Sequence, residues 1–146
     1  MLTGSGPKEA VVRIRRVAAV CYTIISAGVA AFQIALAAGV PWGSYAMGGA
    51  FPGQFPPAMR VAAVVQAALV IFMAAVVLAR AGVALPAWSS TSRWLVWIIV
   101  AVGAVSLVMN IMTPSVGERM IWAPIAILLL ACSVLVATGR PGPEEI

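Results

Sequence analysis

Hydrophobic and polar positions in this 146-residue chain are separated into long blocks. Apolar stretches with few or no charged residues alternate with short segments rich in proline, glycine and arginine. About 20 consecutive apolar residues are enough to cross the hydrocarbon core of a bilayer as a helix. The pattern therefore predicts four membrane-spanning helices, at about residues 17–40, 61–85, 94–113 and 120–138.

Residues that begin and end helices support these boundaries. Pro56 lies just before the second span and Pro86 just after it. Ser115 and Glu118 have the spacing of a capping box, in which two side chains bond free amides at the start of a helix. We expect an all-α fold, an integral membrane four-helix bundle that forms a single transmembrane domain over residues 17–138.

The composition agrees with a membrane environment, because 63% of the residues are hydrophobic and only 9% are charged. A soluble domain of this size has too little interior to bury so much apolar surface. The net charge of +5 would suggest nucleic acid as a partner of a soluble protein. Here the basic residues flank the predicted spans, so we expect them to contact anionic lipid and expect no nucleic acid.

The distribution of basic residues predicts the orientation. Arg60 and Arg119 flank one side of the predicted bundle, and the other seven basic residues flank the opposite side. The positive-inside rule then places both termini in the cytoplasm. Residues 1–16 become a basic cytoplasmic segment, 139–146 a cytoplasmic tail and 41–60 an outer loop. The seven inner residues are Lys8, Arg13, Arg15, Arg16, Arg80, Arg93 and Arg140.

The predicted outer loop is long, yet it carries no charge before Arg60. Its four aromatic residues are Trp42, Tyr45, Phe51 and Phe55. Aromatic rings suit the boundary between lipid headgroups and hydrocarbon. We expect the loop to fold back onto the outer end of the bundle.

Polar residues within spans are costly in hydrocarbon, so their positions are informative. Six polar residues are expected to gather in the outer half, below the aromatic loop, as a binding pocket for a lipid or a small anionic ligand. The alternative is structural: an arginine pairs with Glu118, and the amides bond across helices. The sequence leaves both interpretations open. The six residues are Gln33, Arg60, Gln66, Asn110, Glu118 and Arg119.

Small residues recur along three of the spans, and small residues let helices approach closely in lipid. One row lies on the first span and an interrupted row on the second, while three residues share one face of the third. We expect these faces to contact protein. The rows are Thr23, Ala27, Ala31, Ala35 and Gly39; Ala63, Ala67, Ala75 and Ala79; and Gly103, Ser106 and Asn110.

Catalytic chemistry is poorly represented. The chain has no histidine, and Cys21 and Cys132 are two lone thiols, which do not make a metal site. Glu118 is the only acidic residue outside the terminal segments, and no phosphate loop or paired carboxylates are present. We expect no enzyme activity, no metal and no cofactor.

Several short motifs resemble those of a set of small, uncharacterised four-span membrane proteins of actinobacterial type. The resemblance extends from about Val17 to Ala137. It implies a four-helix membrane fold in which the functionally or structurally important residues lie at the outer face. It implies no known activity. The motifs are Pro41-Trp42-Gly43, Gly48-Gly49, Pro56-Pro57 with Arg60, and Asn110 followed by Ser115, Glu118-Arg119, Trp122 and Pro124.

Two functions fit these features. The first is a non-enzymatic accessory or stabilising subunit of a larger envelope or respiratory complex, because the small-residue rows and the uncharged outer loop suit helix partners. The alternative is a binder, or a homodimeric transporter, of a lipid or small hydrophobic or anionic ligand. The expected partners are membrane lipids, together with other membrane subunits or further copies of the chain.

The predicted orientation can be tested by cysteine labelling in intact cells. We expect a membrane-impermeant thiol reagent to label Ser44→Cys from outside and to leave Ser5→Cys unlabelled until the cells are opened. Labelling of both positions from the same side would contradict the predicted orientation.

Overall fold

A computed structural model of the chain describes residues 6–139 and contains four long α-helices in that range. They are α1 (Pro7–Ala38), α2 (Pro57–Arg80), α3 (Ser89–Met112) and α4 (Val116–Thr138). Each is long and apolar enough to cross a membrane, and residues 6–139 contain no β-strand. The predicted all-α four-helix architecture is confirmed.

The helix boundaries differ in part from the predicted spans. The first helix, α1, begins at Pro7, so the described part of the basic N-terminal segment is helical and continuous with the first span. α2, α3 and α4 each begin about four residues before their predicted spans. Residues 1–5 and 140–146, which include Arg140 and nearly all of the predicted tail, lie outside the described residues.

Short 3-10 helices occupy the connections. Two of them, η1 (Gly43–Tyr45) and η2 (Met47–Gly49), lie in the predicted outer loop, and η3 (Pro86–Trp88) precedes α3. α1 ends at Gly39, whose φ of 98° lies in the left-handed region that favours glycine. Its amide and the next one bond back to carbonyls of the last helical turn, so the chain turns sharply into the loop.

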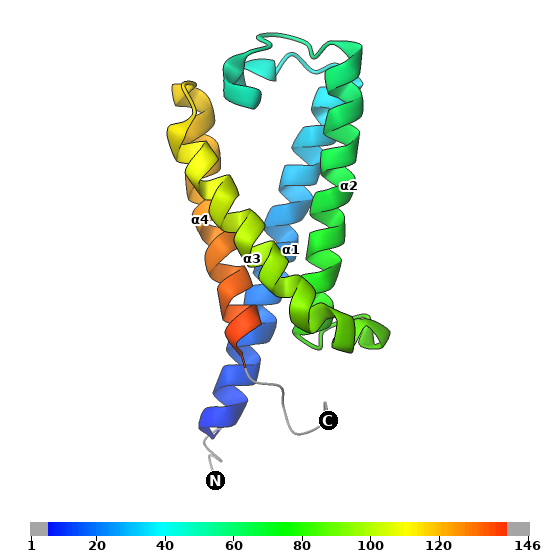
Figure 1. The fold of residues 1–146 in the computed structure, drawn as a ribbon, viewed down its shortest axis with the longest axis vertical. Helices are drawn as coiled ribbons and strands as arrows, with labels where there is room; N and C mark the ends of the chain where they lie inside the picture. The colour runs from blue at the N-terminus through cyan, green and yellow to red at the C-terminus, as the bar shows by residue number, and fades with distance from the viewer. Residues whose placement is uncertain (1–5, 140–146) are drawn as a thin grey trace.

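The helices pack as two pairs, α1 with α2 and α3 with α4. Figure 1 shows the pairs crossing near the end of the bundle that carries the α2–α3 connection and separating toward the opposite end. The loop between α1 and α2 crosses the separated end. We call this separated end the outer end and the other the inner end, following the predicted orientation.

The buried side chains explain why the pairs pack more closely at one end than at the other. A buried cluster at the inner end takes residues from all four helices, including Ala19, Val77, Val96 and Val136. A second cluster, at the outer end, contains Leu36, Ala46, Phe55 and Ala63, which belong to α1, the loop and α2. Because α3 and α4 contribute nothing to the outer cluster, the two pairs are free to separate there.

The predicted small-residue row is largely buried within the chain on α2 but not on α1, so contact of the α1 row with another chain stays a prediction. On α2, Ala63, Ala67 and Ala79 are buried as predicted. On α1, Ala27 and Ala31 are exposed, and the buried face instead carries residues such as Ser26 and Ala30. The α1 face is offset because Tyr22, Gln33 and Leu36, which are larger, also point inward.

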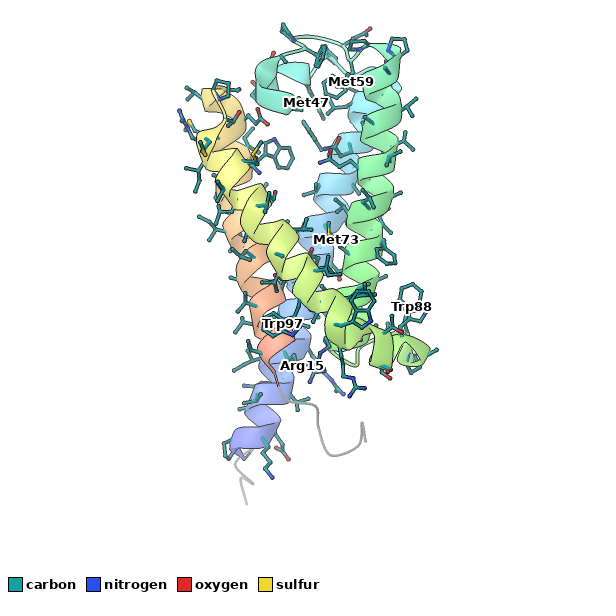
Figure 2. All side chains as sticks on the ribbon, in the orientation of Figure 1. Arg15, Met47, Met59, Met73, Trp88 and Trp97 are labelled. Atoms are coloured by element: carbon teal, nitrogen blue, oxygen red, sulfur yellow. The ribbon has the colours of Figure 1, made fainter. Side chains whose placement is uncertain are left out.

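Two arginines join helices at the inner end. Arg15 of α1 is only 3% exposed and donates a hydrogen bond to the carbonyl of Arg80, the last residue of α2. The Arg80 side chain in turn donates to the carbonyl of Gly139, just after α4, at 3.2 Å. Figure 2 shows Arg15 at this end. Cationic side chains stabilise the carbonyl-rich C-terminal ends of helices, so these arginines connect α1, α2 and α4.

Candidate functional site: a cavity beneath the outer loop

Glu118 connects the outer loop to the start of α4. Its Oε2 atom accepts a hydrogen bond from the Gly48 amide at 2.7 Å and another from the Thr113 hydroxyl at 2.9 Å. The Ser115 hydroxyl accepts from the Glu118 amide at 3.3 Å, as an N-cap does, and donates to the carbonyl of Ser44 at 3.0 Å. The predicted Ser115 cap is therefore present, but the Glu118 carboxylate bonds the loop and Thr113 instead of completing a capping box.

Aromatic residues make a second connection between the loop and the helices. The Trp122 indole of α4 donates to the carbonyl of Tyr45 at 2.7 Å. The same ring meets Phe32 of α1 edge to face, with centroids 4.7 Å apart, and Phe32 stacks on Trp42 at 5.9 Å. A buried indole needs an acceptor for its N–H, and here a loop carbonyl supplies it.

The loop itself has a tightly constrained backbone. Gly43 is buried, and a Cβ atom at this position would lie 1.9 Å from the carbonyl oxygen of Phe51. Three consecutive residues, Met47 to Gly49, have positive φ angles of 52°, 71° and 73°. This left-handed run includes Gly48, whose amide bonds Glu118. The glycines of the loop thus serve close packing and a backbone direction that other residues rarely adopt.

Beneath the loop lies a cavity of about 830 Å³ between the two helix pairs. All four helices line it, together with the loop and the Thr113–Pro114 connection. Its walls are mainly apolar and include Val29, Ala126 and Leu129. This volume lies in the range typical of small-molecule sites, 300–1,000 Å³.

The three amides predicted to gather in the outer half all line this cavity, but they do not bond one another. Gln33 is 8% exposed, and no hydrogen bond to its side chain is present within residues 6–139. Gln66 likewise has none and is exposed. Asn110 donates to the carbonyl of Ser106, one turn earlier on its own helix, at 2.8 Å. The expected network of amides across helices is absent from the described chain, and the Gln33 amide faces the cavity without a protein partner.

The two predicted arginines lie elsewhere. Arg60 donates from Nε to the Phe55 carbonyl at 2.8 Å, and its guanidinium lies against Gly39, where α1 ends. Arg119 is exposed on α4. Neither residue lines the cavity, and within residues 6–139 neither pairs with Glu118. Arg60 therefore bonds the loop and places its guanidinium beside the end of α1, away from the cavity.

The aromatic loop residues divide between the cavity and the outer surface. Tyr45 and Phe55 line the cavity, whereas Trp42 packs outside it on Phe32. Phe51 meets Phe55 edge to face at 6.0 Å. The loop folds back onto the outer end of the bundle, as the sequence indicates.

The two sides of the cavity differ in how open they are. On the side of α1 and α4, the Phe32–Trp122 contact closes the gap between the helices. On the side of α2 and α3, the lining residues Ala62, Gln66 and Met109 are exposed. The cavity thus opens sideways between α2 and α3, toward the position of lipid chains in a bilayer.

Some residues that line the cavity or support it were not predicted as site residues from the sequence. Four methionines line the cavity, and Figure 2 shows Met47 and Met59 at the outer end. Methionines are common filler in apolar cores, so their type alone did not mark them. Thr113 and Trp122 carried a weak signal, because a hydroxyl beside a cap and an indole near a span end each need a hydrogen-bond partner. The other two methionines are Met109 and Met112.

No family model, no curated protein and no solved structure matches this chain.

We expect Gly43→Ala to disorder the loop, because the added Cβ would collide with the Phe51 carbonyl. The expected cost is about 1–3 kcal/mol, as for overpacking in other tight sites. Hydrogen exchange of the loop amides measures it. Gly28→Ala is the control, since a Cβ there meets nothing within 4 Å. Equal exchange in Gly43→Ala and the wild type would contradict the described loop.

Proposed function

We propose that this chain is a multi-pass membrane protein that binds an amphipathic small molecule taken up from the outer leaflet. The observation that carries the proposal is the cavity beneath the loop, whose lining includes the Gln33 amide, which has no hydrogen-bond partner within residues 6–139. A ligand with a hydroxyl, carbonyl or amine near Gln33 would supply the hydrogen bond that this amide lacks within the described chain.

The walls of the cavity support an amphipathic ligand. The apolar surface of Val29, Ala126 and Leu129 suits hydrocarbon, whereas Gln33 and Gln66 offer both donors and acceptors to a polar group. Sites that combine mainly apolar walls with a few polar groups are typical of small-molecule binding. The opening between α2 and α3 gives such a molecule a route from the lipid phase.

Nothing in the cavity supports catalysis. Glu118 is its one acidic residue, and its Oε2 atom is already engaged by the loop and Thr113. The chain has no histidine to act as a base near neutral pH. The lack of a catalytic base supports a non-enzymatic protein. The excess of basic residues on one side of the spans supports an orientation in a bacterial inner membrane with both termini in the cytoplasm.

Photolabelling with a diazirine-bearing dodecanol tests the proposal. We expect the wild type, purified in an uncharged detergent, to be labelled on peptides that line the cavity. Ala62→Trp places an indole at the opening and should reduce labelling several-fold. Gln33→Leu removes the buried amide and should weaken retention of the alcohol by about tenfold, the equivalent of one hydrogen bond to a buried group.

Matched control variants distinguish a blocked cavity from a general loss of the fold. Ala68→Trp adds the same indole to an exposed position of α2 that does not line the cavity, and Gln54→Leu makes the same change on the loop surface. Both controls should label like the wild type. Labelling spread evenly over all four helices, unchanged by Ala62→Trp and Gln33→Leu, would overturn the proposal.

A second candidate function is an accessory subunit of a larger membrane complex. It rests on the small part of α3 that the rest of the chain buries. The buried residues of α3 are Ser92, Val96 and Ile99, all in its first half. The exposed small residues Ala27 and Ala31 of α1 offer another surface for close helix contact. Both surfaces suit a partner helix or a second copy of the chain.

Gentle solubilisation of native membranes tests this second candidate. We expect the chain to migrate with a stoichiometric membrane companion, and Ala31→Ile, which enlarges the small-residue surface of α1, to release it. Ile24→Leu, at an exposed position of α1 that is already large, is the control. Migration of the wild type alone would contradict an accessory role.

A further inference from the structure

The charged and polarisable groups around the cavity indicate which amphipathic molecules it accepts. Among residues 6–139, Glu118 is the only acidic side chain that lines the cavity, and no lysine or arginine of that range lines it. Arg60 is held at the end of α1 by the Phe55 carbonyl, and Arg119 is exposed on the outside of α4. The described wall of the cavity therefore has an acidic group and no basic one.

One oxygen of this carboxylate is open to the cavity. Glu118 is 9% exposed, and both of its side-chain hydrogen bonds, from Gly48 and Thr113, go to Oε2. Within residues 6–139, the other oxygen, Oε1, accepts no hydrogen bond, and it is not among the fully buried polar atoms. Both donors are neutral, so the described chain provides the carboxylate with no counter-charge.

The lining of the cavity also includes groups that favour cations. Trp122, Phe32 and Tyr45 present aromatic rings among the lining residues, and ring faces attract cations. Methionine thioethers, such as that of Met47, add polarisable sulfur. A carboxylate with rings and thioethers attracts an organic cation and repels an anionic headgroup, and the low dielectric of the bilayer strengthens both effects.

We propose that the cavity selects hydrophobic cations, that is, amphipathic molecules with an ammonium or phosphonium group that pairs with Oε1 of Glu118. This inference rests on the proposed function and narrows its ligand class. The cation enters between α2 and α3 and leaves its apolar part against the helix walls. It reverses the sequence-based expectation of an anionic ligand, because the two arginines on which that expectation depended do not reach the cavity.

Two ions of nearly equal size and opposite charge provide the test. Equilibrium dialysis measures how tetraphenylphosphonium and tetraphenylborate bind to the purified chain in an uncharged detergent, with protein-free micelles as the blank. We expect the phosphonium to bind at least tenfold more tightly than the borate. Glu118→Gln keeps an acceptor for Gly48 and Thr113 but removes the charge, and it should abolish this preference.

The neighbouring position supplies the control. Arg119→Gln also removes one charge from α4, but its side chain does not line the cavity, so the preference for the phosphonium should persist. Labelling of Glu118→Gln by the diazirine-bearing dodecanol shows that the cavity is still formed in that variant.

The outcomes separate this inference from the proposed function. If the wild type binds the alcohol in the cavity but binds the two ions equally, the cation preference is overturned and the proposed function stands. If neither the alcohol nor the ions bind above the blank, both are overturned. A phosphonium preference that survives in Glu118→Gln also overturns the inference.

Discussion

The structure depends on the requirement that backbone polar groups find partners wherever water is excluded. Helices meet this requirement internally except at their ends, where amides and carbonyls are left over. Here side chains from other elements meet it. Arg15 and Arg80 bond carbonyls at or just beyond the C-terminal ends of α2 and α4, and Glu118 bonds a loop amide beside the N-terminus of α4. These contacts join elements that are far apart in the sequence, so they also set the arrangement of the helices.

The cavity follows from unequal packing along the bundle. At the inner end, small and β-branched residues such as Ala19, Val77 and Val136 let all four helices approach one another. At the outer end, the rings of Phe32 and Trp122 meet across α1 and α4, but the buried cluster takes residues only from α1, the loop and α2. Space between rigid helices remains where no side chain is long enough to fill it.

Much of this architecture could be predicted from the sequence. Four apolar blocks of spanning length leave few alternatives, and the Ser115 cap and the buried row of Ala63 and Ala67 were visible in the spacing of residues. The site was harder. Gln33, Gln66 and Asn110 could be assigned to the outer half of the bundle, but depth does not reveal whether amides bond one another or face a space. The direction of Arg60 depends on Phe55, which lies just before α2, and on Gly39, at the end of another helix, and neither belongs to the helical pattern of α2.

The separation of the two helix pairs has a mechanical consequence. At the outer end, α4 and its N-terminal junction are joined to the loop by the bonds of Glu118, Ser115 and Trp122, while the close packing of all four helices lies at the inner end. The two helix pairs are therefore packed tightly together at the inner end and are connected by the loop at the outer end. The loop bonds therefore set how far the two helix pairs separate. Bilayer thickness and lateral pressure act most strongly on separated helices, so a change in either would alter the cavity first.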